Sequence, residues 1–352
     1  MKHVIVSSLY HRFLKSLRVA NAYGGLMRIS KLILKFAALA TIAWIPATQA
    51  VLISPGDGTQ NTTTPAGAPS WYNVGRLSIG GGVYIGNGWV LTAAHLDPGT
   101  NHSITFYTNT GLPNDGFPGS GTTYQLDTTP AGFHRLTNPD STSTDLVLTR
   151  TLTDPGLPSL TIATATPGNG TGILLEGLGV NRGAAVQYNA AFIEVPSGGT
   201  YSGFKFVPND NEFGRVSKRW GTSATTPFGA STTKVENNIQ NASFTTVFGS
   251  TFRSPTNSPT SSEAIGISGD SGGAIFSSTS PNTLLGIMLY QTTFANQPAG
   301  SALYGNGTEA ANLATYAAQI QSIVSTPEPV TGLVLLGGLG MLLRRTRRTL
   351  IR

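Results

Sequence analysis

The stretch Gly269-Asp270-Ser271-Gly272-Gly273 decides how the rest of the chain is interpreted. Glycines on both sides of Ser271 permit backbone conformations that a side chain would forbid, so the serine is predicted to stand on a strained, tight turn. A hydroxyl is a poor nucleophile at neutral pH. A nucleophilic serine therefore needs a base within hydrogen-bond reach and a third group that orients the base. The alternative is an ordinary serine in a Gly-rich turn.

A candidate base lies upstream of this turn. Residues 89–94 read Trp-Val-Leu-Thr-Ala-Ala, an apolar strand that ends in two small residues, and His95 follows directly. The pattern predicts an imidazole at the end of a strand. After residue 50 the other histidines are His102 and His134, and neither has this setting. A core or surface histidine without a function is the alternative for His95.

The candidate acid is Asp145, which opens the apolar run 145–148. A carboxylate that begins a buried strand is desolvated, so it needs a cationic or hydrogen-bond-donating partner. Asp140 is the rival acid, but Pro139 before it and the Ser/Thr residues after it indicate a loop. An ordinary turn or cap residue is the alternative for Asp145.

In chain order the three residues are His95, Asp145 and Ser271, and this order resembles that of the trypsin/chymotrypsin-like serine peptidases. Residues 80–95 resemble the hairpin that leads to the histidine of that family, and residues 284–290 resemble the strand that walls its specificity pocket. The resemblance implies an all-β fold of two antiparallel barrels with a C-terminal helix. Residues 310–324 carry the apolar stripe that such a helix needs.

The resemblance also implies a role for each residue. His95 would take the proton of Ser271 as the serine attacks a peptide carbonyl, and Asp145 would orient the imidazole. The backbone N–H groups of Gly269 and Ser271 would form the oxyanion hole. No cluster of His, Asp or Glu has the spacing of metal ligands, so we expect neither a metal nor another cofactor.

Three further residues are predicted to bind substrate. The base of the specificity pocket falls on Ile265, six residues before Ser271, where relatives that cut after Arg or Lys have an acid. An apolar base would leave a cationic side chain buried and unpaired, so we expect apolar or small residues before the cut. Tyr290 and Gln291 lie in the strand that walls the pocket, and Gln291 narrows the pocket if no gap shifts the alignment.

The net charge of +6 comes from the two ends of the chain. Residues 1–50 hold seven of the 22 Lys/Arg and residues 329–352 hold five, with no acid in either segment. The central part holds the other ten Lys/Arg and all 16 acidic residues, so its net charge is negative. This argues against nucleic acid as a partner.

The N-terminal residues 1–50 resemble a secretion signal. A second methionine, Met27, begins a short cationic segment, the apolar stretch 32–46 follows, and signal peptidase is expected to cut after Ala50. Met27 is the expected true start, and a buried N-terminal helix is the alternative. In relatives that are made as zymogens, Asp270 pairs with a new N-terminus; Val51-Leu52-Ile53 matches such an end only imperfectly.

The C-terminal residues 326–352 resemble a PEP-CTERM sorting signal. Pro327-Glu328-Pro329 precedes the 14-residue apolar run 330–343, and an Arg-rich tail follows. The resemblance implies processing by an exosortase-type enzyme, transient association of residues 330–343 with the membrane as a hydrophobic transmembrane segment, and a Gram-negative bacterium as host. A simple membrane anchor is the alternative, since the run is short for a solitary span.

Between these signals, residues 51–70 are predicted to form a flexible arm and residues 71–325 the peptidase domain. The chain has no cysteine, so packing instead of disulfides must hold the site together. Short apolar runs at barrel-like spacing predict strands at 172–178, 191–195, 204–207, 243–248, 274–277 and 283–290. A basic cluster, Arg215, Lys218 and Arg219, is expected to be solvated.

Together these patterns predict a secreted or envelope-associated serine endopeptidase that acts on protein or peptide substrates. Two alternatives stay open: a catalytically inactive, peptidase-like binding module, and a structural or adhesive extracellular protein. Labelling by a fluorophosphonate probe distinguishes an enzyme from both.

Overall fold

A computed structural model describes residues 51–325 except 55, 57, 59, 79, 97–101, 108–120, 180–181, 207–216, 227–232, 237–242 and 268. All of these residues fall within one compact unit, Ala47–Arg352. The predicted secretion signal and sorting signal lie outside the described residues. Within the described ranges, no helix is both long enough and apolar enough to span a bilayer.

The first half of the domain is a closed antiparallel barrel. Its strands pair in the order β4–β3–β2–β5–β6–β8, and pairing between β4 and β8 closes the ring. An additional strand, β7 (Phe133–Thr137), pairs with β8. The barrel strands are β2 (Val74–Arg76), β3 (Gly81–Gly86), β4 (Trp89–Ala93), β5 (Ser103–Tyr107), β6 (Gly121–Asp127) and β8 (Ser143–Thr151).

The second half repeats this plan. Its strands pair in the order β13–β10–β17–β18–β20–β15, and two residue pairs between β13 and β15 close the ring. The short strands β9 (Thr161–Ile162) and β14 (Thr233–Glu236) pair with β18 and β15. The ring strands are β10 (Gly172–Gly179), β13 (Ser217–Thr226), β15 (Ser243–Thr251), β17 (Ala274–Ser277), β18 (Thr283–Thr292) and β20 (Gly307–Asn312).

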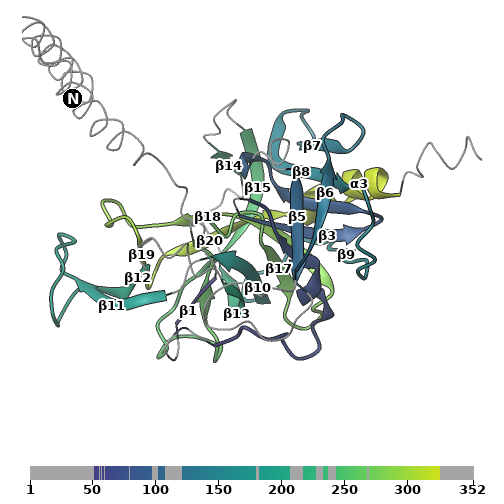
Figure 1. Cartoon of the computed structure of the whole chain (residues 1–352). Helices are drawn as coiled ribbons and strands as arrows, with labels where there is room; N and C mark the ends of the chain where they lie inside the picture. The colour runs from purple at the N-terminus through teal and green to yellow at the C-terminus, as the bar shows by residue number, and fades with distance from the viewer. Residues whose placement is uncertain are drawn as a thin grey trace, which may run out of the picture. The chain divides into compact units, whose positions relative to one another are not determined.

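The remaining elements surround the two barrels (Figure 1). The hairpin of β11 (Arg182–Tyr188) and β12 (Tyr201–Phe206) projects from the barrels and is extended by β19 (Ser301–Leu303). Two 3-10 helices, η1 (Pro69–Asn73) and η2 (Ala94–Leu96), belong to the first half of the chain, and α3 (Leu313–Val324) ends the domain. The predicted all-β, two-barrel fold with a C-terminal helix is confirmed.

One hydrophobic cluster joins the parts of the domain. It contains Val83 and Leu148 from the first barrel, Leu174 and Ile287 from the second, and Ile320 from α3. These side chains are nearly inaccessible to solvent. Burial of side chains of this size stabilises the fold by about 1.5–3 kcal/mol each, which offsets the absence of disulfides.

The residues predicted as a flexible arm are partly interior. Val51 is buried, and Leu52 and Ile53 form β1 (Leu52–Ile53), which pairs with β16 (Ala264–Ile265). Arg182 fixes the segment further, because its guanidinium donates to the carbonyl oxygens of Ile53, Ser54 and Gly56. The prediction followed the Gly- and Pro-rich composition of 51–70 and gave too little weight to the three apolar residues at its start.

Three local predictions also differ from the structure. Residues 191–195 form no named strand, because the chain turns at Phe192, whose φ is +58°. The helix begins at Leu313 instead of 310, since β20 continues to Asn312. Lys218 and Arg219 are only 1% and 2% exposed, so these two residues of the predicted basic cluster are not solvated. Arg215 lies outside the described residues.

Candidate active site

His95 and Asp145 are joined by two hydrogen bonds. The Nδ1 atom of His95 lies 2.7 Å from Oδ2 of Asp145, and the backbone N–H of His95 donates to Oδ1 at 2.8 Å. The carboxylate is fully buried, whereas the imidazole is 27% exposed. With Nδ1–H directed at the carboxylate, Nε2 is the acceptor of the neutral ring. The structure thus brings the predicted base and acid together.

Strand pairing explains this contact. His95 stands two residues beyond Ala93, and Ala93 lies opposite Leu146 in the β4–β8 ladder. Asp145, the third residue of β8, is therefore level with the start of η2. Antiparallel pairing over five residue pairs fixes the relative position of the two side chains.

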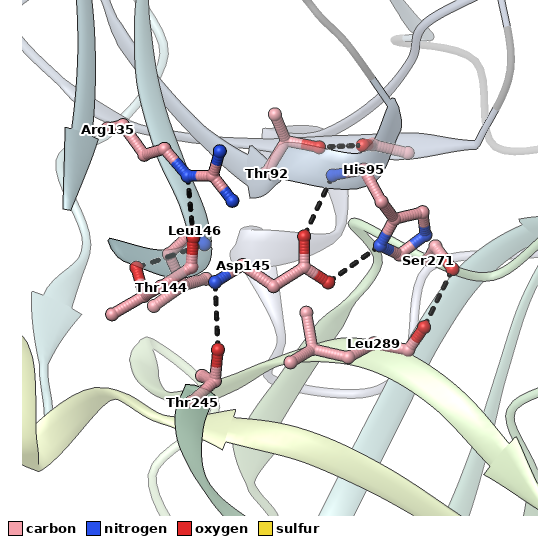
Figure 2. Close-up of polar contacts among 10 residues, drawn as sticks. Thr92, His95, Arg135, Thr144, Asp145, Leu146, Thr245, Ser271 and Leu289 are labelled. Carbon is pink, nitrogen blue, oxygen red and sulfur yellow. Dashed lines mark hydrogen bonds and ion pairs between the residues drawn. The ribbon is translucent and has the colours of Figure 1, made fainter. Parts of the chain in front are cut away.

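Ser271 lies on the predicted glycine turn. Gly269 and Gly272 have φ values of +100° and +81°, which an L side chain rarely adopts. The Ser271 hydroxyl donates to the backbone carbonyl of Leu289 at 2.9 Å. Figure 2 shows Ser271 on the side of the His95 ring that faces away from Asp145.

The glycine turn is attached to the hairpin that carries His95. The N–H of Gly81 donates to the carbonyl of Ser271 at 2.9 Å, and the Thr92 hydroxyl donates to the carbonyl of Gly81 at 2.6 Å. A Cβ atom at Gly272 would lie 2.0 Å from that Gly81 oxygen. Glycine at 272 is therefore required for the two barrels to approach each other here.

Asp270 is enclosed beneath the turn. One carboxylate oxygen, Oδ2, accepts from the N–H of Ile267 at 2.9 Å. Burial raises the pKa of Asp270 well above its ordinary value, and backbone N–H groups, including that of Val51, act in the opposite direction. A Cβ atom at Gly177 would touch both Asp270 Oδ1 and the Val51 side chain, so these two groups are neighbours.

Ile265 is fully buried in β16, opposite Leu52, and its hydrophobic cluster includes Phe252. The next residue, Gly266, is tightly enclosed, because a Cβ there would lie 2.7 Å from the sulfur of Met288. The role of Ile265 as a pocket base stays a prediction, and the surroundings are apolar as expected.

Tyr290 and Gln291 are partly exposed and follow directly after Leu289, which accepts the hydrogen bond of the Ser271 hydroxyl. The Gln291 side-chain amide donates to Asn306 Oδ1 at 3.3 Å. Asn306 is buried and also exchanges hydrogen bonds with Gln297. Gln291 is therefore hydrogen-bonded to Asn306, whose own side chain is held in place by Gln297.

Sequence reasoning did not find two groups at this site. Leu289 contributes only its backbone carbonyl, which leaves no trace in side-chain identity. Thr245 accepts a hydrogen bond from the backbone N–H of Asp145 at 2.8 Å, and it comes from β15 in the other barrel. One threonine in a threonine-rich segment carries no recognisable signal.

The family model for trypsin matches residues 59–196, which include His95 and Asp145. Over this segment, which is less than half of its length, the chain is similar to trypsin-family domains. Ser271 lies beyond the matched residues, so its place in the candidate site rests on the glycine turn and its contacts. No curated protein matches the sequence.

Solved structures similar to this chain include a double mutant of human heparin binding protein, with 15% identity over 76% of this chain and 97% of that chain and a TM-score of 0.44. They also include a protease of M. tuberculosis in an inactive form, with 14% identity over 79% of this chain and 99% of that chain and a TM-score of 0.40.

Proposed function

We propose that the protein is a secreted or envelope-associated serine endopeptidase that cleaves peptide bonds through an acyl-enzyme. The observation that carries the proposal is the pairing of the buried Asp145 carboxylate with Nδ1 of His95, beside Ser271 on its glycine turn. A serine hydrolase requires this combination of nucleophile, base and orienting acid.

In the proposed reaction, Ser271 attacks the substrate carbonyl and Nε2 of His95 accepts the hydroxyl proton. Asp145 holds the ring in the tautomer that leaves the Nε2 lone pair available, and its negative charge stabilises the imidazolium that forms. The same proton then passes to the leaving amine, and water repeats the sequence to release the acyl group.

The oxyanion that forms on the substrate needs donors that are already in place. We assign this role to the backbone N–H groups of Gly269 and Ser271, because the positive φ of Gly269 turns the chain sharply just before the serine. Loss of one such donor in hydrolases costs about 10²–10³-fold in kcat.

For specificity we propose apolar or small residues before the cut. The support is the enclosed, apolar surrounding of Ile265 and the tethered Gln291. A peptide library profiled with the active protein checks this: enrichment of Ala, Val or Leu is expected, and a dominant preference for Arg or Lys would contradict it.

Export is supported by the sequence of the two ends, as is processing by signal peptidase and an exosortase-type enzyme. Mass spectrometry of the protein from its host tests this directly. We expect a mature N-terminus at Val51 and no residues from the Arg-rich tail. Intact ends on the exported protein would refute the processing scheme.

A fluorophosphonate probe tests the activity itself. The wild-type domain is expected to be labelled at Ser271, and Ser271→Ala is expected to abolish labelling. Ser277→Ala serves as the control, because the Ser277 hydroxyl bonds to the exposed neighbours Thr279 and Ser280 and labelling should persist. A correctly folded, processed wild-type protein that resists labelling would refute the enzyme and favour a binding role.

A further inference from the structure

Asp145 is held from two directions. Its carboxylate accepts both hydrogen bonds from His95, and its backbone N–H donates to Oγ1 of Thr245 at 2.8 Å (Figure 2). Both Asp145 and Thr245 are buried, so water does not compete for this N–H group. β8 and β15 are in different barrels and are not paired, so the threonine side chain makes a contact that no β-ladder provides.

The segment of β15 around Thr245 is itself fixed on both sides. The side-chain amide of Asn138, in the turn before β8, donates to the carbonyl of Phe244 at 2.7 Å. The Tyr316 hydroxyl of α3 accepts from the N–H of Thr246 and donates to Oδ1 of Asn138, each at 2.8 Å. These bonds form a closed circuit through α3, β15 and the turn that leads to Asp145.

We propose that Thr245 is a positioning residue, which sets the Asp145 backbone so that the carboxylate aims at His95. The proposal deepens the proposed function and rests on it. Because Asp145 is anchored through its own N–H, a shift of the second barrel against the first moves the acid. Displacement of a catalytic group by about 1 Å costs roughly 10²-fold in rate, so even a partial shift is measurable.

The decisive variant is Thr245→Val, which keeps the shape of the side chain and removes the acceptor. We expect kcat to fall about 10-fold or more with little change in KM, because the substrate does not touch Thr245. Thr245→Ser keeps the hydroxyl and should restore kcat. Unchanged kcat in a folded Thr245→Val protein would overturn the proposal.

Thr149→Val is the matched control. Thr149 is equally buried in β8, but its hydroxyl makes no hydrogen bond within the described residues. Its replacement should leave kcat unchanged. If Thr149→Val lowered kcat as much as Thr245→Val, the effect would reflect general packing of the barrel and the proposal would fail.

The Nδ1 proton of His95, observed by NMR, provides a readout that does not require turnover. In wild type it should give a protected low-field resonance, because it is bonded to a buried carboxylate. In Thr245→Val we expect faster exchange of this proton and a shifted titration midpoint of the ring. A wild-type protein without peptidase activity refutes the proposed function alone. An unchanged resonance and titration in Thr245→Val refutes the positioning role alone.

Discussion

Asp145 is the residue on which the candidate site depends most, because its fully buried carboxylate accepts one hydrogen bond on each oxygen, both from His95. Asp145→Asn keeps the size of the side chain but presents an amide N–H or a weaker acceptor to Nδ1. The ring would then adopt the wrong tautomer. We expect kcat to fall by about 10⁴-fold, while the fold and KM persist.

Steady-state kinetics on a peptide amide checks this prediction. Asp140→Asn is the control, since Asp140 is exposed and its carboxylate accepts from Thr142 in a surface turn. Retention of more than about a tenth of the wild-type kcat in Asp145→Asn would show that the acid is not Asp145.

Gly272 is a second residue whose identity is dictated by geometry. Gly272→Ala adds a methyl group at 2.0 Å from the Gly81 oxygen and 2.5 Å from the Thr92 hydroxyl, in addition to an unfavourable φ of +81°. Gly300 has a similar φ of +74°, but a methyl group there would have no other atom within 4 Å. Gly300→Ala therefore isolates the cost of the backbone conformation, about 1–2 kcal/mol.

We expect Gly272→Ala to lose about 3 kcal/mol or more of unfolding free energy, because the clash adds to the conformational cost. Urea denaturation of both variants measures the difference. Equal losses in the two variants would mean that a methyl group at position 272 does not clash with the Gly81 oxygen, which lies 2.0 Å from the added Cβ in the structure.

Glu176 and Lys218 are both buried outside the candidate site, and each charge acts electrostatically on the other. Burial raises the pKa of Glu176 to about 8 against the opposing effect of Lys218, and burial lowers the pKa of Lys218 to about 7 against that of Glu176. Lys218 donates to the carbonyl oxygens of Trp71 and Val74 and lies 4.5 Å from the centre of the Trp71 ring.

The pair makes stability depend on pH in a definite direction. Between pH 4.5 and about 8 the unfolded chain releases the Glu176 proton while the folded chain retains it, so folding becomes less favourable as pH rises. Lys218 acts oppositely above about pH 7, where the unfolded chain binds the extra proton. Together the two residues therefore contribute least to the stability of the fold near pH 7–8.

Glu176→Gln removes the carboxyl titration. We expect the variant to gain stability relative to wild type as pH rises from about 5 to about 8, by at most about 1.4 kcal/mol per pH unit. Urea unfolding at several pH values measures the gain. Glu194→Gln is the control, because Glu194 forms an exposed ion pair with Lys205. Its free energy of unfolding should change with pH in the same way as that of wild type. If the free energy of unfolding of Glu176→Gln ran parallel to that of wild type over this pH range, the raised pKa could not belong to Glu176.

The sequence predicted His95, Asp145 and Ser271 because each stands in a recognisable local context: a strand end, a strand start and a glycine turn. The structure brings the base and acid together, and their catalytic roles stay a prediction. Lys218 could not be foreseen as buried, since its ammonium group is held by the carbonyl oxygens of Trp71 and Val74, which lie 147 and 144 residues away along the chain.

Among the elements of the fold, α3 connects parts of both barrels. Tyr316 is buried on the helix face toward the barrels and joins β15 to the turn before β8. Burial raises the pKa of its hydroxyl, so it stays protonated and able to donate.

Tyr316→Phe leaves the Thr246 N–H and the Asn138 oxygen without this partner. We expect a loss of about 2 kcal/mol of unfolding free energy, because each buried group keeps its desolvation cost. Ser322→Ala, at an exposed position of the same helix, is the control and should change stability by less than about 0.5 kcal/mol. A neutral Tyr316→Phe would show that α3 is held by apolar packing alone.

Element types were more predictable than element limits. Residues 274–277 were predicted and are found as β17, because apolar residues lie between clear turn signals. The limits of α3 and β20 were not, since Ala310, Ala311 and Asn312 suit a helix as well as a buried strand. Pairing with β15 and β18 decides their conformation, and pairing partners are not visible in a local pattern.

For the molecule as a whole, the buried N-terminal segment would connect the proposed export to the candidate site. Removal of the signal after Ala50 would give Val51 a charged amino group next to the Asp270 carboxyl. A positive charge there favours the ionised form of Asp270, which burial otherwise disfavours by raising its pKa. We therefore predict that protein beginning at Val51 is more stable and more active than protein that retains residues before it.

Two matched proteins, with and without Gln49-Ala50, measure this by urea unfolding and probe labelling rate. Asp270→Asn in both backgrounds completes a double-mutant cycle. Coupling of about 1.5 kcal/mol or more between the free amine and Asp270 is expected for a buried charged contact. Additive effects would exclude a direct link.

The hydrogen bond from Ser271 to the Leu289 carbonyl bears on the kinetics of the proposed reaction. One hydroxyl proton cannot be donated to Leu289 and to His95 at once, so attack begins from a rotamer other than the one that donates to Leu289. If the bond to Leu289 is favoured over the bond to His95 by about 1 kcal/mol, the reactive rotamer is populated in roughly one molecule in six. Rotamers exchange within nanoseconds, far faster than turnover, so this pre-equilibrium lowers kcat by a constant factor without becoming a slow step. A substrate that displaces the Leu289 carbonyl as acceptor would thereby speed its own cleavage.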